Sequence, residues 1–167
     1  MAPFYPLQAK EKGVSVFYVG FVLGSNAVAY IIGSMFASNF LHFDWYGRER
    51  AMVIGMLLIT IQQAGLYAIS YEEDGNIFLL LSIVFQLVGG LGSGNNSVAS
   101  MAMVIADAEK NEREQHIGLI ETSTGVGFLL GPLWGSLMYQ WGGYPAPFGF
   151  SALAYIVFWP CVTYNLY

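Results

Sequence analysis

Charge and cysteine are what this sequence has least of. Only 10% of its 167 residues are Asp, Glu, Lys or Arg, whereas soluble domains carry roughly a quarter. Cys161 is the single cysteine, so neither a disulfide framework nor a cysteine-based metal site is expected. The formal net charge of −5 argues against a nucleic-acid partner, because such proteins neutralise phosphates with an excess of basic residues.

Apolar residues take the place of the missing charge. They make up 56% of the chain and include 12 Phe, 11 Tyr and 4 Trp. A soluble core of this size does not need so much apolar surface, so the sequence predicts an all-α, multi-pass integral membrane protein in contact with the lipid bilayer. We expect one membrane domain over residues 1–167. Its five predicted membrane-spanning helices cover residues 14–41, 51–71, 76–106, 117–141 and 148–167.

The basic residues predict the orientation of these helices. Of the six Lys and Arg residues, four lie in the loops 42–50 and 107–115, and two lie at positions 10 and 12 on the other side. The positive-inside rule therefore places both loops in the cytoplasm or an equivalent compartment. The sequence does not indicate whether the membrane is that of an organelle or the plasma membrane.

The 117–141 helix carries a row of small residues. Gly127, Gly131 and Gly135 recur every four residues, so they lie on one helical face. Pro132, next to Gly131, removes one hydrogen bond from the helix. A glycine face allows another backbone to approach closely inside a bilayer. The pattern predicts that this face packs against another helix.

Two acidic residues are candidates for a role in transport. Glu121 lies about one turn into the 117–141 helix, where an ionisable group is costly and often functional. The alternative is that Glu121 stays at the headgroup level or pairs with Arg48 or Arg50. Asp44 lies in the loop beside those arginines, so membership of a charge network is the first interpretation of it.

The 76–106 helix contributes two uncharged candidates, Gln86 and Asn96. Gln86 starts a stripe of Gly and Ser residues on one face, which either lines a polar cavity or packs against a partner helix. No Ser-His-Asp or Cys-His set can be assembled, and neither histidine has a second ligand at metal spacing. We therefore expect no enzyme, no metal site and no cofactor. The polar residues of the first helix are expected to contact other helices: Ser25, Asn26, Ser34 and Ser38.

Two motifs carry a resemblance to a known family. The run D-W-Y-G-R-E-R resembles the D-(R/K)-x-G-(R/K)-x-(R/K) signature between helices 2 and 3 of the major facilitator superfamily, with matches at Asp44, Gly47, Arg48 and Arg50. The run G-F-L-L-G-P-L-W-G-S at 127–136 is similar to the helix 5 motif G-x-x-x-G-P-x-x-G-G of the antiporters in that superfamily. With the flanking sequences, it is similar to the vesicular amine and polyamine transporters of solute carrier family 18.

The resemblance covers the whole chain and implies helices 2–6 of a twelve-helix fold, which is part of its N-terminal half. It implies a proton-coupled carrier of amines or other small organic solutes, in which two six-helix halves rock about a central site. Helix 1 and helices 7–12 are not expected in these residues, so this chain alone is not expected to transport. The arginine common in helix 4 of such transporters has no counterpart here, and Gln86 is the nearest polar substitute.

Two hypotheses of different classes follow. In the first, the chain is part of a transporter that the missing half completes, and it contributes to the binding of a small-molecule substrate. In the second, it is a non-catalytic subunit of a larger membrane complex, and another subunit covers the glycine face at 127–135. The incomplete loop motif, with Trp45 at a basic position, favours the second hypothesis. The helix 5 motif fits both.

Overall fold

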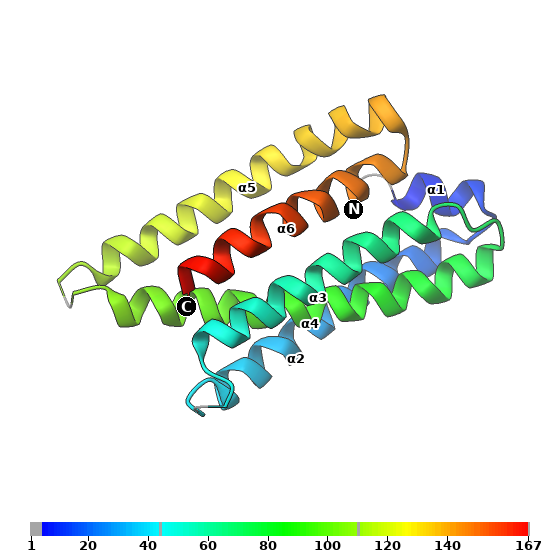
Figure 1. Ribbon diagram of the computed structural model, residues 1–167. Helices are drawn as coiled ribbons and strands as arrows, with labels where there is room; N and C mark the ends of the chain where they lie inside the picture. The colour runs from blue at the N-terminus through cyan, green and yellow to red at the C-terminus, as the bar shows by residue number, and fades with distance from the viewer. Residues whose placement is uncertain (1–4, 44, 110, 167) are drawn as a thin grey trace.

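The computed structural model describes residues 5–43, 45–109 and 111–166, and these form helices without any strand (Figure 1). The all-α membrane fold expected from the composition is confirmed. The six helices in this part of the chain are α1 (Tyr5–Glu11), α2 (Val16–Phe40), α3 (Arg48–Ile69), α4 (Gly75–Asp107), α5 (Arg113–Gly142) and α6 (Pro145–Leu166).

Helices α2 to α6 coincide with the five segments predicted from the sequence, with ends that differ by up to four residues. Among the described residues, four helices are long and apolar enough to cross a membrane: α2, α3, α4 and the Pro145–Tyr164 part of α6. Helix α5 has 30 residues and a length of about 45 Å, which suffices to cross. It is less apolar because the run E-T-S-T-G at 121–125 interrupts it.

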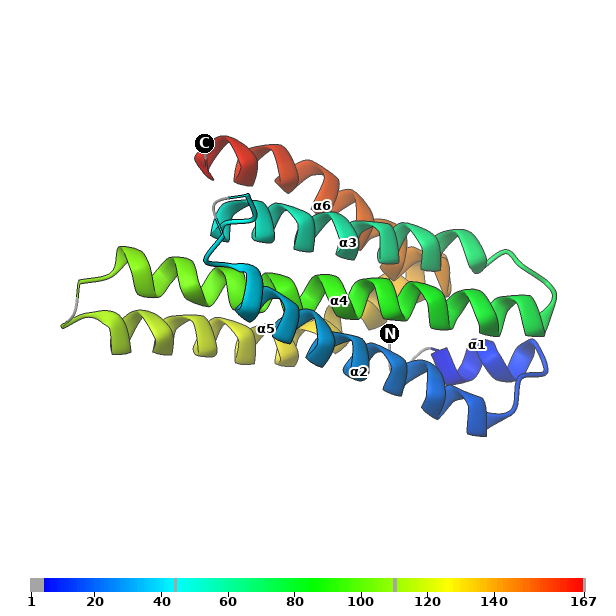
Figure 2. The same cartoon turned by 90° about the horizontal axis from the view of Figure 1, so that it is seen from below.

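Helix α4 is the centre of the bundle, since α2 and α3 both pack along it (Figure 2). Small residues make these contacts close. A Cβ atom added to Gly94 would meet the carbonyl oxygen of Tyr30 and the amide nitrogen of Ser34 on α2. On the other side of α4, a Cβ at Gly92 would meet the carbonyl oxygen of Gly55 on α3. Glycine is therefore required for the backbones to approach this closely.

Helices α5 and α6 form the outer part of the bundle. Helix α6 packs on α3 and α5 packs chiefly on α6, so α6 lies between α5 and α3 (Figure 1). At the contact with α3, Gly149 lies against the ring of Tyr67. Most of α5 is exposed, and Met138 is its one buried residue. This part of the fold leaves one long helix with little of its surface covered.

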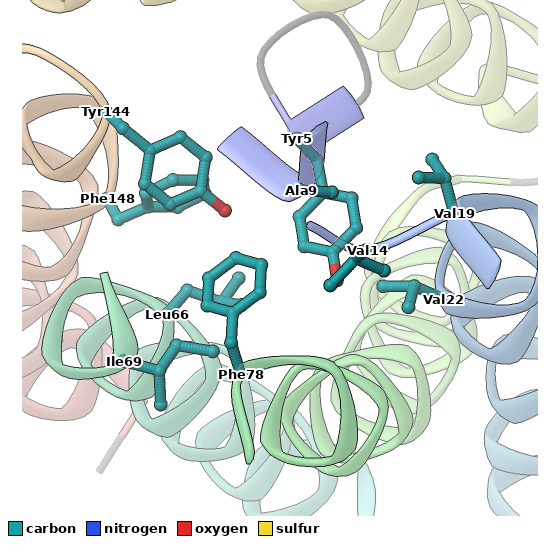
Figure 3. Packing of buried hydrophobic residues seen from close by; sticks show 10 residues of the cluster. All are labelled: Tyr5, Ala9, Val14, Val19, Val22, Leu66, Ile69, Phe78, Tyr144 and Phe148. Atoms are coloured by element: carbon teal, nitrogen blue, oxygen red, sulfur yellow. The ribbon is translucent and has the colours of Figure 1, made fainter. Parts of the chain in front are cut away.

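Helix α1 was not predicted, because residues 1–13 are short, polar at their end and interrupted by proline. Tyr5 and Ala9, one turn apart, are fully buried, and the ring of Tyr5 stacks on Phe78 of α4 with centroids 5.5 Å apart. Figure 3 shows Tyr5 and Tyr144 on either side of Phe78. The ammonium group of Lys12 donates to the backbone carbonyls of Ser70 and Glu72. Helix α1 thus covers one end of the bundle.

The contact between α2 and α4 can be tested at Gly94. We expect Gly94→Ala to lower the free energy of unfolding by roughly 1–3 kcal/mol, because the added methyl group meets backbone atoms that cannot move aside. Gly24→Ala is the matched control, since a Cβ at Gly24 on α2 meets nothing within 4 Å. Thermal unfolding in mild detergent measures both variants. Equal midpoints for the two variants would contradict the close contact.

Candidate functional site

A cluster of amide side chains joins the three central helices. Gln86 of α4 accepts a hydrogen bond at its Oε1 atom from Gln62 of α3, at 2.6 Å. Asn26 of α2 donates to the same Oε1 atom at 3.1 Å and to the backbone oxygen of Gln86 at 3.1 Å. Gln62 and Gln86 are buried. Amides do not titrate near neutral pH, so this cluster forms hydrogen bonds but does not take up or release a proton.

Glycine makes room for this cluster. The side-chain amide of Gln62 occupies the place that a Cβ atom at Gly89 would take. Gly89 is buried and lies less than one turn from Gln86 on α4. The close approach of α3 to α4 and the hydrogen bond between Gln62 and Gln86 therefore depend on the same small residue.

A second polar group lies nearer the end of the bundle that carries the loop motif. Asn95 of α4 is buried, and its amide donates to the backbone oxygen of Ala51 at 2.5 Å. The hydroxyl of Tyr46, in the loop before α3, donates to the Oδ1 atom of Asn95 at 2.5 Å. Burial raises the pKa of Tyr46, which keeps this hydroxyl protonated as a donor. Asn95 thereby fixes the start of α3 to the middle of α4.

The uncharged candidates predicted from the sequence fall in different environments. Gln86 belongs to the amide cluster and contacts a partner helix. Asn96 is half-buried, its Cβ atom lies under Gly55 of α3, and its Oδ1 atom is buried without a hydrogen-bond partner. The role of either residue in transport stays a prediction.

The candidates on α5 are open to the surroundings. Glu121 is exposed, and no ion pair joins it to Arg48 or Arg50 in the part of the chain that the structure describes. A Cβ atom at Gly127 or Gly131 would meet nothing within 4 Å. Pro132 is exposed and Gly135 is half-buried. The glycine face, defined as Gly127, Gly131 and Gly135, is largely uncovered in this chain.

The loop motif is only partly described, since Asp44 lies outside the described residues. Gly47 has φ of 60° and precedes α3 as its N-cap residue, a backbone conformation that favours glycine. Arg48 is the first residue of α3 and is exposed. Arg50 donates from Nη1 to the backbone oxygen of Trp45 at 2.8 Å. The motif therefore builds a tight turn between α2 and α3.

The sequence predicted part of the polar interior. Asn26 does contact another helix, as predicted. The hydroxyls of Ser25, Ser34 and Ser38 donate to carbonyls of their own helix, while the backbone of Ser34 lies at the contact with Gly94 of α4. Asn95 was overlooked, although an asparagine at the centre of an apolar helix is itself a signal of an interhelical hydrogen bond.

A helical bundle of this kind, with apolar helices around a polar interior, is that of a multi-pass integral membrane protein. Comparisons with known sequences define the family. The sequence model of the Major Facilitator Superfamily matches residues 1–166, so the chain belongs to that superfamily. It is 27% identical to the MFS-type transporter SLC18B1 of Mus musculus over 99% of this chain and 36% of that protein.

Other relatives support the same assignment. The vesicular acetylcholine transporter of Drosophila melanogaster is 29% identical over 80% of this chain and 22% of its own length. Multidrug resistance protein 2 of Bacillus subtilis is 24% identical over 92% of this chain and 36% of its own length. The chain thus spans about a third of the length of these relatives or less. No solved structure matches it.

The amide cluster can be tested at Gln86. We expect Gln86→Leu to lower the free energy of unfolding by about 1–2 kcal/mol, because it leaves the amide of Gln62 without its acceptor and Asn26 with only the backbone oxygen of residue 86. Gln63→Leu is the control, since Gln63 is next to Gln62 on α3 but half-buried and outside the cluster. Unfolding in mild detergent measures both. If both variants unfold alike, the cluster does not stabilise the bundle.

Proposed function

We propose that this chain forms helices 2–6 of a carrier for small organic solutes, with amines as the substrate class and protons as the coupling ion. The observation that carries the proposal is the family match over residues 1–166. The name of one relative, the vesicular acetylcholine transporter, supports an organic cation as cargo. Rocking of two halves about a central site is the mechanism that such a fold uses.

Glu121 is the residue we assign to coupling. It is the only Asp, Glu, Lys or Arg within the five segments predicted to span the membrane. A carboxyl group in that position binds and releases protons, which the amides of the central cluster do not. Its exposure on α5 leaves it accessible to water or to a substrate ammonium group in the complete transporter.

Transport by vesicles that contain this chain together with the rest of the carrier tests this assignment. Under an imposed proton gradient, we expect Glu121→Gln to reduce uptake of a labelled amine by about tenfold or more, since the amide holds no titratable proton. Glu114→Gln is the control, because Glu114 lies in the first turn of the same helix. Gradient-driven uptake that survives Glu121→Gln would remove Glu121 from coupling. Absence of uptake by the unaltered complete carrier, in which this chain is joined by the remaining helices, would contradict the carrier function.

A second candidate function is a non-catalytic subunit of a larger membrane complex. The open glycine face of α5 favours it, because Gly127 and Gly131 have nothing within 4 Å of the positions their Cβ atoms would take. Close backbone packing against a helix of another subunit would cover this face. In a transporter, the same face would be covered by the rest of the carrier.

The glycine face makes a prediction that concerns assembly. Gly131→Leu should abolish association with the chain that packs there, because a leucine side chain keeps two backbones apart. Gly125→Leu is the matched control, since Gly125 is equally open but lies on a different side of α5. The mass of the particle extracted in mild detergent, with every co-purifying chain identified, measures both. An unchanged particle with Gly131→Leu would exclude this face as an interface.

A further inference from the structure

A groove of about 670 Å³ lies where the ends of four helices meet. Its polar lining consists of Ser38 and His42 at the end of α2, Arg48 at the start of α3 and Arg113 at the start of α5. Its apolar lining consists of Ala102, Ile105 and Ala106 in the last turns of α4, together with Leu41 after α2. The groove is therefore basic on one side and apolar on the other. None of the described lining residues is a carboxylic acid.

The two arginines of the groove have no carboxylate partner in the described part of the chain. Arg113 donates from Nε to the backbone oxygen of Ala108 at 3.5 Å, and Arg48 is exposed. Their acidic sequence neighbours Glu49 and Glu114 are also exposed and form no ion pair with them. Two guanidinium groups beside one cavity repel each other unless an anion lies between them.

The backbone adds positive potential at the same place. Helix α3 begins at Arg48 and α5 begins at Arg113, and neither N-cap residue makes a side-chain capping hydrogen bond. A helix N-terminus carries free amide donors and a partial positive charge, so a basic residue there is unfavourable. Each helix has an arginine as its first residue and one acid in its first turn, Glu49 in α3 and Glu114 in α5. An anion in the groove would satisfy the arginines and the helix ends together.

We propose that this groove binds the phosphate of an anionic phospholipid, with an acyl chain along the apolar wall of α4. The phosphate oxygens accept hydrogen bonds from Arg48 and Arg113 in the bidentate geometry that guanidinium groups favour. A lipid fits better than a free phosphate ion because the groove lies at the ends of membrane-spanning helices and has an apolar wall. The loops here carry four of the six basic residues, which predicts the cytoplasmic leaflet, where anionic lipids concentrate.

The experiment compares the thermal stability of the purified protein in mild detergent with added short-chain phosphatidylglycerol or phosphatidylcholine. Phosphatidylglycerol should raise the unfolding midpoint more than phosphatidylcholine, and native mass spectrometry should show it bound. Arg48→Gln with Arg113→Gln should lower the preference for the anionic lipid by about twentyfold or more, about fivefold for each side chain. Arg48→Lys with Arg113→Lys keeps the charge but loses the bidentate geometry, so it should retain only part of the preference.

Arg50→Gln is the matched control, because Arg50 lies two residues from Arg48 but binds the backbone of Trp45. It should keep the preference for phosphatidylglycerol. Three outcomes would overturn the proposal: equal effects of the two lipids, a preference that survives loss of both arginines, or an equal loss with Arg50→Gln. If inorganic phosphate reproduces the whole shift, the groove is a site for a free anion and the lipid assignment is wrong. Circular dichroism of each variant confirms that it is folded.

Discussion

The close approach of backbones along α4 is the interaction on which the rest of this structure depends. Inside a bilayer the hydrophobic effect does not hold helices together, so van der Waals contact and interhelical hydrogen bonds must do so. Gly94 and Gly92 let α2 and α3 approach opposite sides of α4. Only at that separation do Asn26 and Gln62 reach Gln86. The polar interior is therefore a consequence of the glycines, and any function of the interior rests on them.

Two glycine-rich helices in the same chain have different surroundings. Gly90, Gly92 and Gly94 of α4 lie against backbone atoms of neighbouring helices, whereas the positions of a Cβ atom at Gly127 and Gly131 of α5 have nothing within 4 Å. The small residues at helical spacing indicate the same capacity for close packing in both helices. On α4 that capacity is used within the chain. On α5 it is available to the remainder of a carrier or to another subunit, which is why the structure of this chain fits both functional hypotheses.

Hydropathy and charge predicted the helices of this protein well, because each apolar run ends at a charged or proline-containing turn. The same reasoning did not find α1, whose helical character comes from burial of Tyr5 and Ala9 on one face and not from apolar length.

Asn26 was assigned correctly as an interhelical contact. The hydroxyls of Ser34 and Ser38 donate to carbonyls of their own helix, as the amide of Asn39 also does, so the residue type alone did not predict which polar side chains join two helices. The groove between Arg48 and Arg113 brings together residues from distant loops, so only the folded chain could reveal it.

The central position of α4 also has a consequence for synthesis in the membrane. Helices α2 and α3 precede α4 along the chain, yet each packs on α4, and α2 with α3 is not a principal contact. A ribosome delivers α2 and α3 first, with the amides of Asn26 and Gln62 still lacking their acceptor. Until α4 is inserted, these amides lie in hydrocarbon without a partner or remain near the translocation machinery. The three-helix core therefore cannot close before α4 arrives, since both earlier helices pack on it.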